Sequence, residues 1–274
     1  MEPFSVPPIM FPLVVNVCVL VITLLYGCRE DMRERAVPVV MWYPAIAIGI
    51  PMLIWFWHSV ITSGDLPFMM PLIPLIIFFV IAFYLFTRFN LMGMADTKAL
   101  ILITMLVPCF PFVPLAGYPL YGIPPYVFLP MSVLINAVIC NLLLPIFFFF
   151  KNILQANRAP LPYLFLGYPV RGESIADEFG IVMEHFEEKD GHLIRSFIPV
   201  RLAIKDMIAG GKRVYTKSLK EHPNLYRREL ELYKKAGTVW ISYGVPFLIP
   251  ITVGFVSAIL LGDALIIFAS FITG

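Results

Sequence analysis

The sequence predicts an all-α integral membrane protein with six transmembrane helices and a small cytoplasmic domain, α or α+β, between helices five and six. Of its 274 residues, 59% are hydrophobic and only 14% are charged, whereas roughly a quarter of the residues in soluble domains are charged. The charges are also unevenly distributed, because 15 of the 20 Lys and Arg residues lie between residues 151 and 237. This composition argues against an ordinary soluble domain.

Six runs without any Asp, Glu, Lys or Arg define the expected spans. Each run has about the 17 to 25 residues that a helix needs to cross the hydrocarbon core of a bilayer. The runs are Pro8–Tyr26, Val39–Trp57, Phe68–Thr87, Ala99–Ala116, Tyr126–Phe150 and Thr238–Leu261. We therefore expect three regions: residues 1–150 with helices one to five, residues 151–237 as the cytoplasmic domain, and residues 238–274 with helix six and a C-terminal tail.

Basic residues predict the orientation of these spans, since Lys and Arg resist transfer across the membrane. All 20 of them follow spans one, three and five. The other connections, at residues 1–7, 58–67, 117–125 and 262–274, contain none. The predicted protein is a multi-pass protein of the cell membrane with both termini outside and three connections in the cytoplasm.

The cytoplasmic region has weaker signals of secondary structure. Ile175–Glu188 mixes apolar and acidic residues, which is typical of a surface helix or of a short pair of strands. Further helices are expected at Val200–Ile208, before two glycines, and at Leu225–Lys235. These elements do not predict a particular fold for the domain.

Two aspartates are the candidate catalytic residues. Asp31 lies about one turn beyond the apolar part of span one, and Asp96 lies just before span four, on the same predicted side of the membrane. If these spans pack side by side, the two carboxyl groups could share one water molecule. One would stay protonated while the other acts as a base, which is the chemistry of an aspartic peptidase. The position of Asp96 at a helix N-terminus predicts that it is the ionised member.

Structural explanations of both aspartates, and other functions, remain open at this point. Asp96 could simply be the N-cap of a helix, and Asp31 could belong to a solvated cluster of Arg and Glu. Paired carboxylates also occur in proton-coupled membrane transporters, and the spans could merely anchor a functional cytoplasmic domain. The four cysteines and four histidines show no metal-ligand spacing. We therefore expect no metal ion and no cofactor.

Three segments carry a resemblance to type IV prepilin peptidases. Asp31–Pro38 resembles their Asp-x-Arg-x-x-x-Ile/Val-Pro segment, and Gly93–Lys98 resembles Gly-x-Gly-Asp-x-Lys, with Ala95 at the second glycine. The stretch Val239–Pro250 is similar to that of the archaeal branch, the preflagellin (pre-archaellin) and prepilin peptidases. These are membrane aspartic proteases of the GxGD type, and the resemblance implies that Asp31 and Asp96 are the catalytic pair.

The resemblance also implies a substrate and a cellular location. Family members remove a short, basic leader peptide from preflagellin or prepilin precursors on the cytoplasmic side. The expected partners are therefore these precursors and the lipid bilayer, with no nucleic acid, whereas nothing in the sequence indicates an oligomeric state. Bacterial relatives also methylate the new N-terminus and carry a cysteine-containing insert, which this chain lacks between spans one and two, so we expect no methylation. A presenilin-like GxGD protease with other substrates is the alternative within this class.

Overall fold

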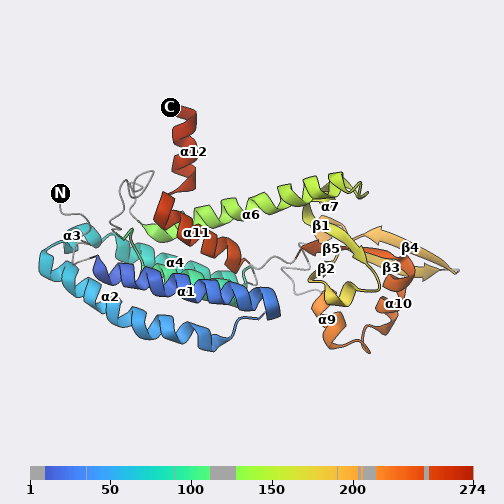
Figure 1. The fold of residues 1–274 in the computed structure, drawn as a ribbon, viewed down its shortest axis with the longest axis horizontal. Helices are drawn as coiled ribbons and strands as arrows, with labels where there is room; N and C mark the ends of the chain where they lie inside the picture. The colour runs from blue at the N-terminus through green and yellow to red at the C-terminus, as the bar shows by residue number, and fades with distance from the viewer. Residues whose placement is uncertain are drawn as a thin grey trace. The chain divides into compact units, whose positions relative to one another are not determined.

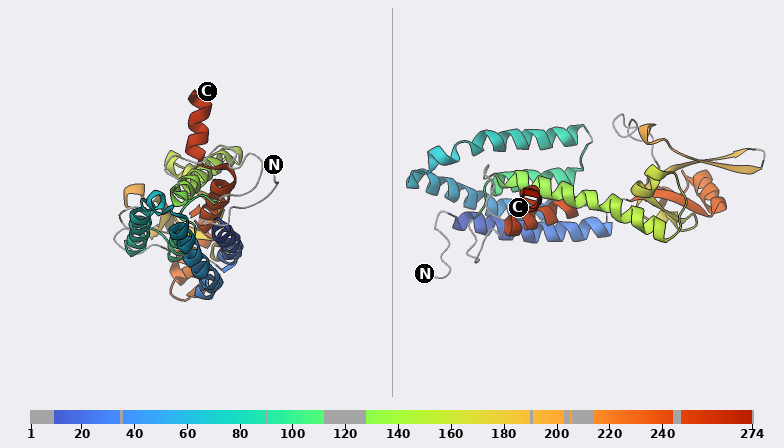
Figure 2. Two further views of the ribbon diagram at one scale, coloured as in Figure 1. Left: turned by 90° about the vertical axis from the view of Figure 1, so that its left-hand side faces the viewer. Right: turned by 90° about the horizontal axis from the view of Figure 1, so that it is seen from above.

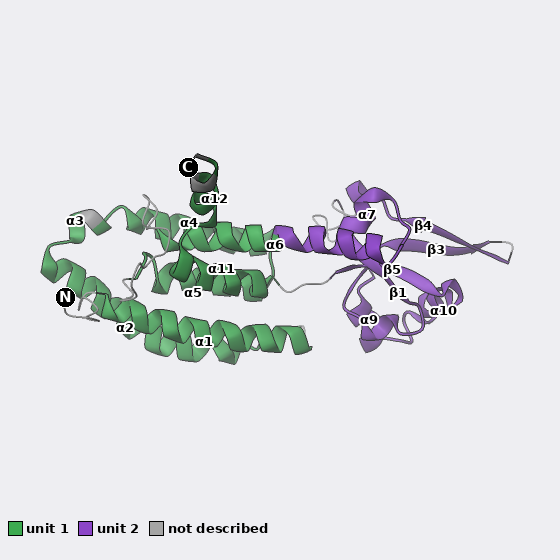
Figure 3. Cartoon of the chain, turned by 45° about the horizontal axis from the view of Figure 1, so that its top comes forward, with its two compact units in different colours: residues 1–141, 246–274 green, residues 142–245 purple. Residues whose placement is uncertain are grey.

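The computed structural model describes two compact units of the chain. Unit 1 comprises residues 1–141 and 246–274, and unit 2 comprises residues 142–245 (Figure 3). The described residues are 10–34, 36–89, 91–111, 128–189, 191–202, 205, 214–243 and 247–273. Within these ranges unit 1 is built from helices, and all five strands belong to unit 2.

Most helices of unit 1 form a bundle and are seen nearly end-on in the left view of Figure 2, whereas the C-terminal helix projects away from the bundle. Its elements are α1 (Phe11–Glu34), η1 (Val39–Trp42), α2 (Tyr43–Ser63), α3 (Leu66–Met69), α4 (Leu72–Arg88), α5 (Met94–Leu106), the first part of α6 (Leu129–Leu154), α11 (Leu248–Leu261) and α12 (Ala264–Thr273) (Figure 1). Among the described residues, three helical segments are long and apolar enough to cross a membrane, namely α1, η1 with α2, and α6. The count of six spans therefore stays a prediction.

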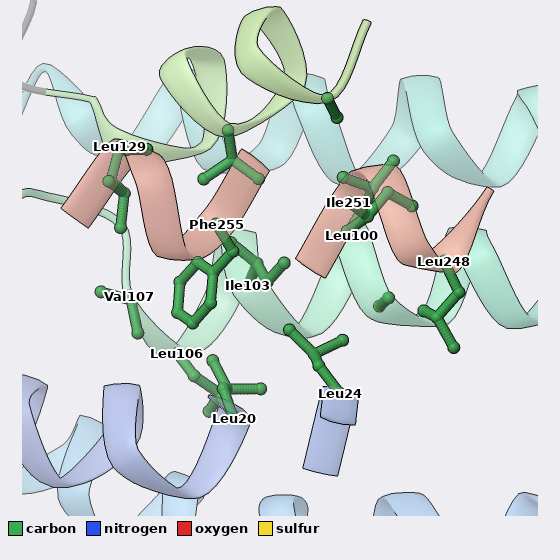
Figure 4. Packing of buried hydrophobic residues seen from close by; sticks show 14 of the residues in the cluster. Leu20, Leu24, Leu100, Ile103, Leu106, Val107, Leu129, Leu248, Ile251 and Phe255 are labelled. Carbon is green, nitrogen blue, oxygen red and sulfur yellow. The ribbon is translucent and has the colours of Figure 1, made fainter. Parts of the chain in front are cut away.

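Helices α1, α5 and α11 share the central core of unit 1. Figure 4 shows Leu24 of α1, Ile103 of α5 and Phe255 of α11 directed into this core, and all three side chains are fully buried. The core residues recur at intervals of three or four, such as Leu20 and Leu24 on α1, which places them on one face of each helix. The core therefore joins helices that are far apart in the sequence.

The end of α5 shows how a buried backbone carbonyl group of this bundle obtains a hydrogen-bond donor. α5 has only 13 residues and ends at Leu106, so its last carbonyl groups need hydrogen-bond donors from elsewhere. The fully buried side chain of Asn16 on α1 donates from Nδ2 to the Leu106 carbonyl oxygen at 2.8 Å. Such bonds are required where water does not reach the backbone, and they allow a short helix to end inside the bundle.

One predicted helix begins later than the charge-free run that indicated it. Thr238–Tyr243 is the strand β5, and the helix α11 starts only at Leu248. The assignment of this stretch to a transmembrane helix was wrong, because a run without charges is equally compatible with a buried strand. β-Branched and aromatic residues dominate these six positions and favour a strand. The expected C-terminal tail contains the helix α12.

Unit 2 contains two small antiparallel sheets. β5 lies in the middle of a three-stranded sheet between β1 (Gly167–Arg171) and β2 (Gly180–Val182), while β3 (Glu184–Lys189) and β4 (His192–Phe197) form a hairpin. The remaining elements are α7 (Leu161–Leu166), η2 (Ile175–Asp177), α9 (Thr216–Glu221) and α10 (Arg227–Ala236). The segment 175–188 contains strands, but they do not form the expected pair, because β2 pairs with β5 and β3 with β4. α10 confirms the helix expected at Leu225–Lys235. The helix expected at 200–208 lies largely outside the described residues.

The end of α6 is attached to the sheet of unit 2 by two sets of contacts. The ring of Phe148 stacks on Tyr243 of β5 and on Tyr168 of β1, with centroid distances of 4.5 and 5.5 Å. The fully buried Asn152 donates from Nδ2 to the carbonyl oxygens of Leu164 and Gly167 at 2.8 and 2.7 Å. These contacts join the end of α6, α7 and the first strand into one structure.

The buried carboxylate of Glu184 pairs with Arg195 inside the hairpin of unit 2 and joins the hairpin to β5. Glu184 of β3 accepts hydrogen bonds from Nε and Nη2 of Arg195 at 3.0 and 2.7 Å. Its second carboxylate oxygen accepts the backbone N–H of Trp240 at 2.8 Å. The Glu184 side chain is 1% exposed, yet both of its oxygens have donors. A buried charge of this kind is tolerated because it is paired and hydrogen-bonded.

Candidate active site

Asp96 occupies the third position of α5, one turn into the bundle. The N-cap of α5 is Gly93, so Asp96 is not the N-cap that the structural explanation of this residue assumed. Its carboxylate instead accepts the backbone N–H of Gly93, as acidic residues at the third helical position commonly do. This bond directs the carboxyl group back toward the start of the helix.

Gly93 is needed here for space and not for an unusual backbone conformation. Its φ of −65° and ψ of 149° are accessible to every residue. A Cβ atom at this position, however, would lie 2.8 Å from Oδ2 of Asp96. Ala95, which stands in place of the second glycine of the motif, lies inside α5 and is not among the residues with positive φ, as expected. The first glycine therefore allows the carboxyl group to fold back against the backbone, and the second position does not require glycine.

Asp31 lies in the last turn-and-a-half of α1, which continues to Glu34 and so carries the helix beyond its apolar part. α1 packs against α5 in unit 1, which is the arrangement that would bring the two aspartates together. The charge of Asp31 acts on the carboxyl group of Asp96. The fold thus places both predicted residues in one electrostatic environment, although 65 positions of the sequence separate them.

The environment of Asp96 favours its protonated form. Asp96 precedes the charge-free segment that begins at Ala99, and burial together with the nearby charge of Asp31 raises the pKa of Asp96 to about 7. The N–H groups of Gly93 and Leu248 act in the opposite direction, since they stabilise the ionised carboxylate. We expected the helix N-terminus to keep Asp96 ionised. Loss of solvation and repulsion from a like charge outweigh that favourable effect.

A third helix reaches this site. Leu248 is the first residue of α11, its side chain is fully buried, and its N–H donates to Asp96. One turn further along α11, the hydroxyl of Thr252 donates to the Leu248 carbonyl oxygen at 2.8 Å. Thr252 Oγ1 also lies 3.1 Å from the thiol sulfur of Cys28, three residues before Asp31.

The sequence reasoning missed these three residues. Cys28 was considered only as one of four cysteines without metal-ligand spacing. Leu248 lies within the stretch Val239–Pro250, whose resemblance to the archaeal peptidases was noted, but the sequence of that stretch does not indicate what it contacts. Thr252 and Ser257 are the two hydroxyl residues in the apolar sequence of α11, and they were the local signal that could have drawn attention to this helix.

Known proteins are similar to most of this chain. The model of the Type IV leader peptidase family matches residues 18–146, which include Asp31 and Asp96, and the model Archaeal Peptidase A24 C-terminus Type II matches residues 159–264. The preflagellin peptidase of Methanococcus voltae is 25% identical over 245 residues, which cover 89% of this chain and 93% of that protein. The two matches follow one another along most of the chain. The chain belongs to the A24 family of type IV leader peptidases.

Proposed function

We propose that this peptidase is a membrane-embedded aspartic endopeptidase that removes the short basic leader from preflagellin or prepilin precursors. The family and the similarity to a preflagellin peptidase support this reaction. The observation that carries the mechanism is the electrostatic coupling of Asp31 and Asp96 between the packed helices α1 and α5. Two carboxyl groups that share a site cannot both ionise cheaply, so one proton is retained between them.

In the proposed reaction the two aspartates have different roles. Asp31 is the base that takes a proton from a water molecule, whose oxygen attacks the carbonyl carbon of the scissile peptide bond. Protonated Asp96 donates a hydrogen bond to the carbonyl oxygen, which becomes the oxygen of the tetrahedral intermediate. Asp96 then gives its proton to the amide nitrogen, the C–N bond breaks, and a carboxylic acid and a new N-terminal amine are released. The proton that Asp31 took from the water passes to Asp96 and restores the starting state of the pair. The raised pKa of Asp96 is the reason for this assignment.

We propose that the enzyme cleaves without methylating the new N-terminus. The connection between α1 and the first turn of η1 comprises only residues 35–38, which leaves no room there for the cysteine-containing insert of the bacterial methylating relatives. The same proposal includes no metal ion and no cofactor, because two carboxyl groups and a water molecule supply all the protons that the reaction requires.

The proposed topology is multi-pass in the cell membrane, with six spans, both termini outside and the aspartates at the cytoplasmic face. The distribution of all 20 basic residues supports this orientation. α4, α5 and α11 have 17, 13 and 14 residues, fewer than the roughly 20 needed to cross a bilayer alone. α5 and α11 are largely surrounded by other helices, and backbone that is buried in protein does not have to span the lipid as a regular helix.

The test uses the full chain in membranes and a precursor that carries a basic leader. Wild type is expected to shorten the precursor, whereas Asp31→Asn and Asp96→Asn are each expected to leave it uncut. Mass spectrometry of the product would show a free amine at the new N-terminus if no methylation occurs. Cleavage by either variant would contradict the aspartate mechanism. Cleavage of other membrane helices, with the leader left intact, would instead support a presenilin-like protease.

A further inference from the structure

A chain of contacts through α11 connects the helices that carry the two aspartates. Leu248 contacts Asp96 through its N–H group and Thr252 through its carbonyl oxygen. Thr252 in turn contacts Cys28, which is on the same helix as Asp31. α11 therefore meets both aspartate-bearing helices within its first turn and a half, and none of these contacts requires Leu248 or Thr252 to touch the substrate.

The direction of the central hydrogen bond follows from the donors available. A threonine hydroxyl has one proton, and Thr252 donates it to the Leu248 carbonyl oxygen at 2.8 Å. The contact between Sγ of Cys28 and Oγ1 of Thr252, at 3.1 Å, is therefore a bond in which the thiol donates. Both residues are almost completely buried, with 8% and 5% of their surface exposed, so water does not compete for this bond.

The packing around this bond is unusually close. A Cβ atom at Gly27, the neighbour of Cys28, would lie 2.6 Å from Cε of Met41 and 3.0 Å from Cδ2 of Leu248. The absence of a side chain at Gly27 thus leaves room for Met41 and for the first residue of α11 against α1. Both aspartates are also near enough to Cys28 for their charges to act on its thiol. The thiol–hydroxyl bond consequently lies beside the proposed reaction centre.

We propose that Thr252 and Cys28 are positioning residues of the peptidase site, which hold the first turn of α11 so that the Leu248 N–H group stays on the carboxyl group of Asp96. This inference rests on the proposed aspartate mechanism. The N–H group stabilises ionised Asp96, so its position sets the pH at which Asp96 loses its proton. Cys28 and Thr252 tune the reaction without exchanging protons with the substrate.

The primary test is the pH profile of cleavage by Thr252→Val, which removes the hydroxyl and keeps the shape of the side chain. If the Leu248 N–H moves away, Asp96 retains its proton to a higher pH, so the alkaline limb of the profile shifts upward by about half a pH unit to one unit. We expect kcat to fall about tenfold, the effect of one hydrogen bond to a charged group, with KM nearly unchanged. The position of the limb does not depend on how much of the variant folds.

Two conservative variants, Cys28→Ala and a double variant sharpen this test. Thr252→Ser keeps the hydroxyl at position 252, and Cys28→Ser keeps a hydrogen-bond donor at position 28. Both variants are expected to retain the wild-type pH profile. Cys28→Ala is expected to shift the limb in the same direction as Thr252→Val, by less. Because the two residues act through one bond, Cys28→Ala combined with Thr252→Val is expected to shift it no further than Thr252→Val alone.

Thr104 of α5 offers a matched control. It is fully buried, and its hydroxyl makes the same bond within its helix, to the Leu100 carbonyl oxygen at 2.7 Å. Thr104→Val is expected to leave the limb in place. If Asp31→Asn and Asp96→Asn abolish cleavage but Thr252→Val has the wild-type profile, the positioning role is refuted while the aspartate mechanism stands. If the aspartate variants still cleave the precursor, the aspartate mechanism on which this inference rests is refuted.

Discussion

Each unit shields a carboxyl group from water, Glu184 being buried and Asp96 partly buried, and the surroundings of these groups differ in one respect. Glu184 in unit 2 and Asp96 in unit 1 both accept a backbone N–H, from Trp240 of β5 and from Leu248 of α11 respectively. Glu184 additionally faces the guanidinium of Arg195, whereas Asp96 experiences the negative charge of Asp31. A cation makes a buried carboxylate a structural element, and a second carboxylate makes it a group that can hold a proton near neutral pH.

The largest expected effect is the contrast between the two carboxyl groups in one cleavage assay. Asp96→Asn is expected to reduce leader cleavage by about 10³-fold or more, because the amide cannot supply the proton that the mechanism requires. Glu184→Gln is expected to retain cleavage, since Glu184 acts on the folding of unit 2. The initial rates of both variants, normalised to folded protein, check this contrast. Similar losses in the two variants would remove the distinction between a reactive and a structural carboxyl group.

Gly93→Ala is expected to have the next largest effect, a loss of about 10²-fold in cleavage. The added Cβ would lie 2.8 Å from Oδ2 of Asp96, closer than two such atoms tolerate, and would displace the carboxyl group. Ala95→Gly is the matched control, because Ala95 is helical and a smaller residue disturbs no contact of Asp96 there. The two rates are compared with wild type. Full activity of Gly93→Ala would show that the position of the carboxyl group is less constrained than the structure indicates.

The pH dependence of stability and of cleavage also distinguishes Asp96 from Glu184. The pKa of Asp96 in the folded protein is raised to about 7 from an ordinary value of 3.8. The stability that protonated Asp96 contributes is fully present below pH 3.8 and is lost as the pH rises through about 7. We therefore expect thermal stability to fall across this window in wild type, with a smaller slope in Asp96→Asn. Cleavage is expected to decline above pH 7 for the same reason. Equal slopes in both proteins would contradict the raised pKa.

The smallest expected effect concerns the ion pair of unit 2 and leaves the chemistry intact. Arg195→Met leaves the carboxylate of Glu184, 1% exposed, without its cation, and is expected to destabilise unit 2 by about 2 kcal/mol. Lys235→Met is the control, because it breaks the Lys235–Glu188 pair, whose side chains are 56% and 41% exposed, and costs about 0.5 kcal/mol. Hydrogen exchange of the β3 to β5 amides in the full chain measures both effects. Equal protection in the two variants would mean that burial of Glu184 is not decisive.

Local sequence patterns predicted much of this fold. The apolar runs indicated α1, α2 and α6, and the mixed pattern near residue 230 indicated α10. The same kind of pattern misassigned Thr238–Tyr243, because its pairing with β1 and β2 is what makes this stretch a strand. A strand in the middle of a sheet and a membrane helix are both apolar, so composition alone does not separate them.

The candidate site, like the fold, was predicted from the sequence only in part. The position of Asp31 and Asp96 at the ends of apolar runs identified them without any structure. Their protonation did not follow from the sequence, since the helix N-terminus alone favoured an ionised Asp96 and burial beside Asp31 reverses that preference. The role of Gly93 likewise needed the path of the Asp96 side chain, which the motif does not contain.

The sequence by itself determined that this chain is a helical membrane protein with a polar domain between its last apolar segments. It also determined which carboxyl groups lie at segment ends, because hydrophobic length and charge are local properties. The tertiary structure decided which groups meet. Cys28 and Thr252 are 224 positions apart and lie within hydrogen-bonding distance only because α1 and α11 share a core. Proton affinity depends on such neighbours, so the chemistry of the site was decided by packing and not by the order of residues.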